Sequence, residues 1–148
     1  MNNNSNEIKK IIAPQVLRLN SFCHATICGD TIYISGMIPS KTGGNTLVEG
    51  GMASQTTQCL INIEHVLEEC GAKWSNVAKL SVFMDNFDGN GDKEKARVQF
   101  AEYNNAYLKF FEERNVPVCG RITVGAKGLA LGCMIEIDGI AYLPKSKF

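Results

Sequence analysis

Two runs near the C-terminal end, in which apolar and polar residues alternate, place the strongest constraint on how this chain folds. Arg121 lies near the start of the first run, residues 119–125, and Glu136 lies inside the second, residues 133–141. A period of two is typical of a strand with one buried face. The linker between the runs contains glycines, as turns do. We therefore expect two neighbouring strands that bring Arg121 close to Glu136.

An arginine and a glutamate held together in this way have two interpretations. A guanidinium is a planar fork that binds a carboxylate through two hydrogen bonds, and a glutamate can hold a water or move a proton. The pair is therefore a candidate site for binding and processing a small carboxylate. The alternative is a plain cross-strand ion pair worth about 0.2–1 kcal/mol, which the local pattern alone favours.

The composition limits the classes of function. The chain of 148 residues is long enough for one soluble domain with a core, and its 15 basic and 15 acidic side chains leave no net charge. Without a basic cluster we expect no grip on a nucleic-acid backbone. The neutral balance also permits self-association.

Cysteine usage and hydropathy bear on metals and on the compartment. None of the six cysteines forms a CxxC pair, and His24 and His65 are far apart in the sequence, so we expect no metal site. We find no charged start followed by an apolar run that would indicate export, and no run of the ~20 apolar residues that span a bilayer. We therefore expect a cytoplasmic protein with reduced thiols and no membrane contact. Disulfides between the six cysteines are the alternative.

Local patterns predict a single domain with an N-terminal extension. We expect residues 1–15 to be disordered or extended and residues 16–148 to form the domain. In chain order, the predicted elements are a strand at 16–19, a hairpin of strands 21–28 and 31–35, a helix at 52–70, a strand at 77–84, a helix from 93 to about 115 and the two C-terminal strands.

The apolar positions predict what each element buries. The first helix has one apolar stripe, with Gln55 and Asn62 mostly outside it. The second helix, with Asp92 as its expected N-cap, carries an aromatic stripe that we interpret as core: Phe100, Tyr103, Tyr107, Phe110 and Phe111. One side of strand 77–84 is expected to carry Ala78, Leu80, Val82 and Met84.

The order of elements favours an α+β layer, in which two helices cover one face of a mixed sheet. The other face is then bare. The aliphatic residues of the two C-terminal strands are expected to face the helices, which would leave Thr123 and Glu136 on the bare face. A partly apolar bare face commonly marks an oligomer contact.

Several segments match the pattern of one known family. They are residues 35–39, 55–62 and 82–83, Asn104 with Tyr107, Phe110 with Phe111, Gly120 with Arg121, and residues 135–141. Over about residues 19–143 the chain resembles the Rid family of reactive intermediate (enamine/imine) deaminases, also called YjgF-like, liver perchloric-acid-soluble or L-PSP endoribonuclease proteins. The spacing between Arg121 and Glu136 agrees with that family without a gap.

The resemblance implies a chorismate-mutase-like (YjgF-like) domain, assembled as a homotrimer with ligand sites between subunits. It also implies hydrolysis of 2-enamino and 2-imino acids (2-aminoacrylate/2-iminopropanoate and 2-iminobutanoate) to 2-oxo acids and ammonia, without a cofactor. By resemblance, Arg121 clamps the substrate carboxylate and Glu136 positions water and handles protons. Ser35 and Gly36 would line the cleft, and Asn104 would support it.

Three positions depart from the family pattern. Phe22 stands where a cleft tyrosine is typical, Cys119 where a proline is usual, and Thr123 where a cysteine is common. We expect Phe22 and Thr123 still to line the cleft and to affect the substrate range. Two other functions remain open: a trimer that binds small carboxylates without turnover, and an endoribonuclease or translation inhibitor, which the neutral composition does not support.

Overall fold

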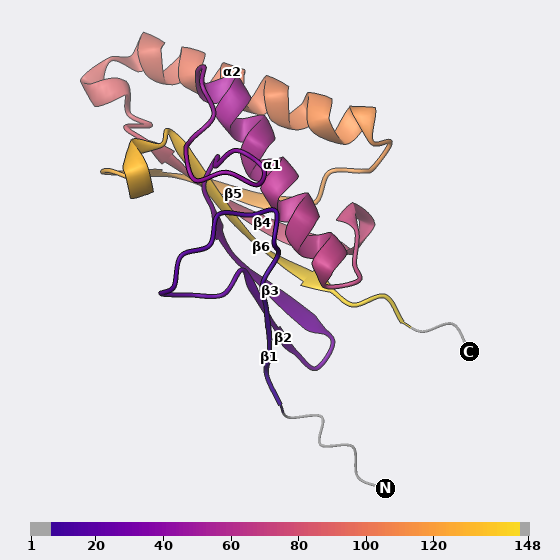
Figure 1. Cartoon of the computed structure of the whole chain (residues 1–148). Coiled ribbons are helices and arrows are strands. Elements are labelled where there is room, and N and C mark those ends of the chain that lie inside the picture. The colour runs from indigo at the N-terminus through magenta and orange to yellow at the C-terminus, as the bar shows by residue number, and fades with distance from the viewer. Residues whose placement is uncertain (1–6, 146–148) are drawn as a thin grey trace, which may run out of the picture.

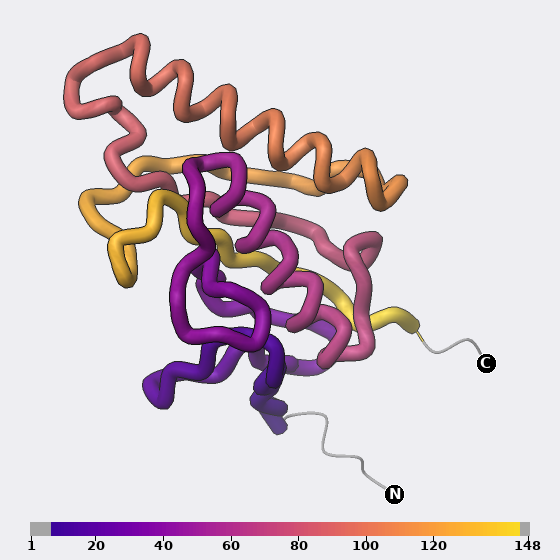
Figure 2. The backbone as a smooth tube through the Cα atoms, turned by 45° about the horizontal axis from the view of Figure 1, so that its top comes forward, coloured from indigo at the N-terminus to yellow at the C-terminus, as the bar shows by residue number. Residues whose placement is uncertain are grey.

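A six-stranded sheet and two long helices on one of its faces make up the structure, a computed structural model that describes residues 7–145 (Figure 1). The elements are β1 Lys9–Ile11, β2 Ala25–Cys28, β3 Thr31–Met37, α1 Met52–Glu69, β4 Val77–Asp85, α2 Lys93–Glu113, β5 Gly120–Ala126 and β6 Ile135–Tyr142, with short 3-10 turns at 74–76, 89–91 and 130–132. The two helices lie on the same side of the sheet and are inclined to each other (Figures 1 and 2). This confirms the predicted α+β layer.

The strands follow the order β1-β2-β3-β6-β4-β5. All pairs are antiparallel except β4 and β5, which are parallel because α2 forms the crossover between them. The chain then returns along the other side of β4 as β6, which also pairs with β3. The prediction that the two C-terminal strands are neighbours is therefore wrong, because β4 lies between them.

The N-terminal segment departs from the predictions at one strand. Residues 16–19 form a loop, because the buried His24 ring accepts a hydrogen bond from the Ala13 amide (2.9 Å) and its other nitrogen donates to the Leu17 carbonyl (3.0 Å). The strand in this region is β1, which pairs with β2 and lies within the segment predicted to be disordered or extended. Residues 1–6 of that segment lie outside the described residues.

The hairpin of β2 and β3 is confirmed, although β2 begins at Ala25 and not at residue 21 as predicted. Gly29 adopts φ +58° in the turn that joins the two strands, a conformation in which glycine has no steric cost. Further along β3 the register with β6 shifts between Ile34 and Met37. This irregularity includes Ser35 and Gly36 and therefore sets where those two residues point.

The helical predictions hold, with two informative exceptions. The apolar stripe of α1 is buried as expected, and so is the aromatic stripe of α2 except for Phe100, which is only partly buried. Gln55 and Asn62 are buried as well, because their amides bind backbone groups: Gln55 Oε1 accepts from the Met134 amide (2.7 Å), and Asn62 Nδ2 donates to the carbonyls of Ile38 and Ser40 (both 3.0 Å). Polar side chains thus tie α1 to the loops that follow β3 and precede β6.

In β4 the predicted inward row is confirmed for Leu80, Val82 and Met84 but wrong for Ala78, which is exposed. The register of β4 with β6 shifts between Val77 and Lys79. The shift turns Val77 inward in place of Ala78.

Candidate functional site

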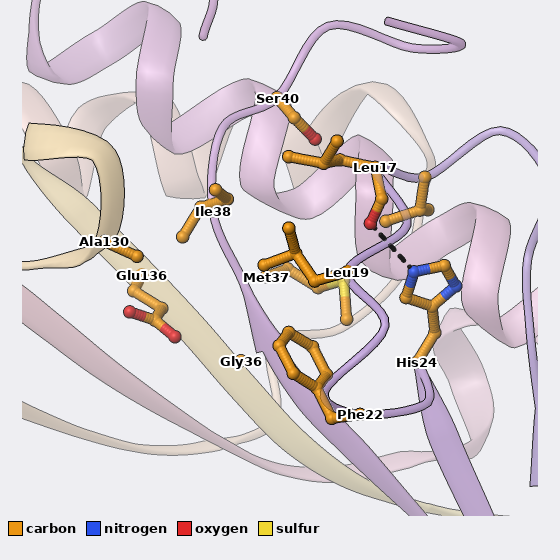
Figure 3. Close-up of a pocket in the computed structure, with 11 residues that line it drawn as sticks. Leu17, Leu19, Phe22, His24, Gly36, Met37, Ile38, Ser40, Ala130 and Glu136 are labelled. Atoms are coloured by element: carbon orange, nitrogen blue, oxygen red, sulfur yellow. Dashed lines mark hydrogen bonds between the residues drawn. The ribbon is translucent and has the colours of Figure 1, made fainter. Parts of the chain in front are cut away.

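Glu136 projects from β6 into a pocket on the face of the sheet away from the helices. Its neighbours Ile135 and Ile137 are fully buried beneath the helices, and the alternation of a strand then directs Glu136 to the opposite face. The pocket has a volume of about 90 Å³ and is largely aliphatic (Figure 3). It is lined by Val16, Leu17, Leu19, Phe22, His24, Gly36, Met37, Ile38, Ser40, Ala130 and Glu136.

Three of the predicted site residues therefore meet here: Phe22, Gly36 and Glu136 (Figure 3). A Cβ atom at Gly36 would collide with Oε1 of Glu136, so the glycine lets the carboxylate lie directly against β3. The two other polar side chains of the lining are occupied: His24 holds the Ala13–Leu17 turn, and Ser40 Oγ accepts from Asn62 (3.2 Å).

Burial raises the pKa of the Glu136 carboxyl group, and the negative charge of Asp138 raises it further. A carboxyl group with a raised pKa is a better proton acceptor once it is ionised, and it can also hold a proton at higher pH. Glu136 therefore has the properties of a general acid–base group at the edge of an apolar pocket.

Ser35 lies beside this pocket and helps to hold part of its wall in place. Its hydroxyl donates to the Cys23 carbonyl (2.7 Å), which ties β3 to the segment that carries Phe22. Ser35 and Phe22 also line an adjoining hollow with Lys10 and Arg18. The serine hydroxyl is thus engaged with the backbone, next to the Glu136 pocket.

Arg121 lies on β5, the edge strand of the sheet, and points to α2. Its Nη1 donates to Oδ1 of Asn104 (3.0 Å). The guanidinium carbon lies 4.5 Å from the ring centroid of Tyr107 and 5.0 Å from that of Tyr103. Thr123, two residues along β5, faces the same way, and its hydroxyl is 3.1 Å from the Tyr103 hydroxyl. These five residues form what we call the Arg121 cluster.

The structure does not bring Arg121 and Glu136 together within one chain. Arg121 is paired with Leu80 of β4, whereas Glu136 is paired with Phe83 from the other side of that strand. The two side chains also lie on opposite faces of the sheet. The expectation of a direct neighbour pair is wrong because a sequence pattern shows which residues alternate but not which strand separates them.

The faces of β5 are also the reverse of the prediction. Ile122 and Val124 are 47% and 36% exposed and share the bare face with Glu136, whereas Thr123 faces α2. The reason is that α2 presents an asparagine and two tyrosine hydroxyls to this edge strand, which suit polar residues of β5.

The two tyrosines of the Arg121 cluster were predicted only as core, and they are buried. Their second role, as ring faces for a guanidinium, depends on how α2 lies over β5. The sequence carried a partial signal, because Tyr103 and Tyr107 are four residues apart and therefore share one helix face.

The described residues contain no group of three or more His, Cys, Asp or Glu side chains that could hold a metal ion. All six cysteines, which fall within the described range, are unpaired. Within residues 7–145, no helix is both long and apolar enough to cross a membrane.

The chain is similar in sequence to proteins of one family. The family model described as "Endoribonuclease L-PSP" matches residues 13–143. A 2-iminobutanoate/2-iminopropanoate deaminase of Dermatophagoides farinae is 30% identical over 132 residues, which cover 89% of this chain and 91% of that protein. The Rattus norvegicus protein of the same name is 29% identical over 139 residues, covering 93% and 92%.

Solved structures agree. The crystal structure of the YjgF gene product from E. coli superposes with a TM-score of 0.78 at 26% identity, covering 90% of this chain and 98% of that one. The structure of YEO7_yeast gives a TM-score of 0.77 at 29% identity, covering 92% and 98%.

Proposed function

Because this chain belongs to the endoribonuclease L-PSP family, to which the Rid and YjgF-like proteins also belong, we propose that it is a hydrolytic deaminase. Its substrates would be small 2-imino acids and their 2-enamino tautomers. Water adds to the imine carbon of the substrate, the carbon–nitrogen bond breaks, and the products are a 2-oxo acid and ammonia. The deaminase names of its relatives support the class of reaction. The observation that carries the proposal is the pair of complementary half-sites, a cationic one at Arg121 and an acid–base one at Glu136.

Arg121 is suited to clamp the substrate carboxylate. Its partners in the Arg121 cluster are neutral, and no carboxylate of the described residues forms an ion pair with it. Its charge is therefore not compensated within the chain. A guanidinium that is not already paired with a carboxylate of the protein can form two parallel hydrogen bonds to the carboxylate of a ligand.

Glu136 is suited to the proton transfers. In its ionised form it accepts a proton from the attacking water, and in its protonated form it delivers that proton to the departing nitrogen. The pocket beside it has room for a small aliphatic side chain, and Phe22 and Gly36 form part of its wall. An apolar surrounding keeps bulk water away from the reactive imine.

Since the half-sites lie on opposite faces, we place the complete site between two copies of the chain, with Arg121 from one and Glu136 from the next. The bare face of the sheet exposes apolar residues that suit such an assembly: Tyr33, Ile122, Val124 and Tyr142. A cyclic homotrimer would form three such sites by one repeated contact.

The test couples an amino-acid oxidase, which produces 2-iminobutanoate from 2-aminobutanoate, to this protein and follows the loss of the imine. The wild type is expected to accelerate that loss. Arg121→Ala should abolish both the acceleration and the binding of 2-oxobutanoate, and Arg121→Lys should restore little, because an ammonium lacks the planar fork. Glu136→Gln should bind 2-oxobutanoate but lose turnover by roughly 10²–10⁴-fold.

A control separates these effects from damage to the fold. Lys127→Ala removes an exposed positive charge from the turn that follows β5 and should leave the rate unchanged. A wild type that binds 2-oxobutanoate without accelerating imine loss would make this a carboxylate-binding protein. Acceleration that survives Arg121→Ala would show that the site is elsewhere.

A further inference from the structure

Within residues 7–145, no acidic side chain forms an ion pair with the guanidinium of Arg121. The guanidinium lies near the rings of Tyr107 and Tyr103. Its hydrogen-bond partner is the amide oxygen of Asn104. Two of the other three arginines of this chain are held by carboxylates: Arg97 pairs with Glu94, and Arg114 pairs with Glu64. Arg121 therefore differs from them in being fixed by neutral groups alone.

The two rings are themselves anchored to β5 and to the residue just before it, on either side of Arg121. The Tyr103 hydroxyl lies 3.1 Å from the hydroxyl of Thr123, two residues after the arginine. The Tyr107 hydroxyl lies 3.9 Å from the sulfur of Cys119, two residues before it. Because alternate residues of a strand share a face, Cys119, Arg121 and Thr123 form one row that meets the row of α2.

This arrangement can orient a charge while leaving it available. A ring face attracts a guanidinium and restricts its rotation, yet it has no net charge that would neutralise the guanidinium. An amide oxygen uses one of the five N–H donors and leaves the others free for a ligand. A carboxylate in the same place would hold the arginine more strongly but would compete with the ligand for it.

We propose that Tyr103, Asn104 and Tyr107 are positioning residues, which form a neutral cage that presents the guanidinium of Arg121 to the substrate carboxylate. The inference rests on the proposed function, since it assigns to these residues a role in the same site. It also gives a role to the two departures from the family pattern beside Arg121: Thr123 on β5 and Cys119 just before that strand hold the hydroxyl groups of the cage.

The first arm of the test replaces Asn104. Asn104→Asp keeps the shape of the side chain and its acceptor oxygen but adds a negative charge beside Arg121. We expect the dissociation constant of 2-oxobutanoate, measured by calorimetry, to rise about tenfold or more, without a loss of thermal stability. If Asn104 were only a structural support, this variant would bind as tightly as the wild type.

The second arm removes a ring face. Tyr107→Leu should raise the dissociation constant of 2-oxobutanoate about tenfold, and Tyr107→Phe, which restores the ring, should recover most of that affinity. The matched control is Phe110→Leu, which truncates an equally buried aromatic residue of α2 whose ring packs against Arg114 instead. It should lower stability in the same way as Tyr107→Leu but leave the dissociation constant unchanged.

The steady-state constants add a readout that a loss of packing would not reproduce. In the coupled assay the cage variants should raise KM for the imine more than they lower kcat, because they act on the carboxylate and not on the proton transfer. Equal binding by Asn104→Asp and the wild type, or equal weakening by Tyr107→Leu and Phe110→Leu, overturns the cage while the proposed function stands. A wild type whose 2-oxobutanoate binding is absent or independent of Arg121 overturns both.

Discussion

At the scale of single residues, the burial of the Glu136 carboxyl group lowers the stability of the fold when that group is ionised. The carboxyl group lies against Gly36 in an apolar pocket, and burial together with the charge of Asp138 raises its pKa. A carboxyl group whose pKa is higher in the folded than in the unfolded chain binds its proton more tightly in the folded state. The stability that it contributes is therefore complete below the unfolded pKa and is lost as the pH rises through the folded pKa.

This sign leads to a prediction for Glu136→Gln. The amide never ionises, so the variant should be more stable than the wild type at pH ~7, and the difference should shrink to nothing at pH ~3.5, below the ordinary pKa of a glutamate. Urea unfolding at both pH values measures it. A variant that is less stable than the wild type at neutral pH would mean that the ionised carboxylate is stabilised by its surroundings.

At the scale of elements, α2 decides where the cage lies, and its C-terminal end is fastened to α1. One oxygen of Glu64 on α1 accepts from Nε of Arg114 (2.6 Å) and from Nε1 of Trp74 (2.8 Å). The Arg114 guanidinium also stacks 3.5 Å from the Phe110 ring centroid. This half-buried carboxylate thus joins two helices and the turn between α1 and β4.

We expect Glu64→Leu to lower the free energy of unfolding by about 1–3 kcal/mol, because two donors lose their acceptor. The control is Glu113→Leu, which breaks the exposed pair of Lys109 with Glu113 and should cost at most about 1 kcal/mol. Urea denaturation of both variants gives the comparison. Equal losses in the two variants would show that the Glu64 contacts add nothing beyond a surface ion pair.

At the scale of the whole molecule, the opposite placement of Arg121 and Glu136 makes assembly part of the proposed site. The prediction is that two inactive variants complement each other. Arg121→Ala and Glu136→Gln chains, co-expressed with different tags and purified through both, should recover activity, because some interfaces then combine an intact arginine with an intact glutamate. Every cyclic trimer that contains both kinds of chain has one such interface among its three, so we expect roughly a third of the wild-type rate.

The matched control for complementation pairs Arg121→Ala with the Arg121→Ala/Glu136→Gln double variant. That mixture contains no intact arginine and should stay inactive. Light scattering on the doubly tagged samples establishes their oligomeric state. Mixed oligomers without recovered activity would refute a site shared between chains.

The sequence by itself determined the elements and their class. The β2–β3 hairpin, the two helical stripes and the capping of α2 by Asp92, which accepts from the Glu94 and Lys95 amides, all follow from contacts within a few residues. These features can be predicted because the period of burial and the capping side chain involve residues that are close together in the sequence. Glu136 and Phe22 could also be selected from the sequence, but through their resemblance to a family pattern and not through such local signals.

Only the tertiary structure decided which strand lies between Arg121 and Glu136, and which face each side chain takes. Alternation is equally compatible with either face of β5, and the choice came from the asparagine and tyrosines that α2 places over it. The same is true of Gln55 and Asn62, which are buried because distant backbone groups need partners. These outcomes depend on contacts between residues far apart in the chain, and a single sequence does not record which of those contacts form.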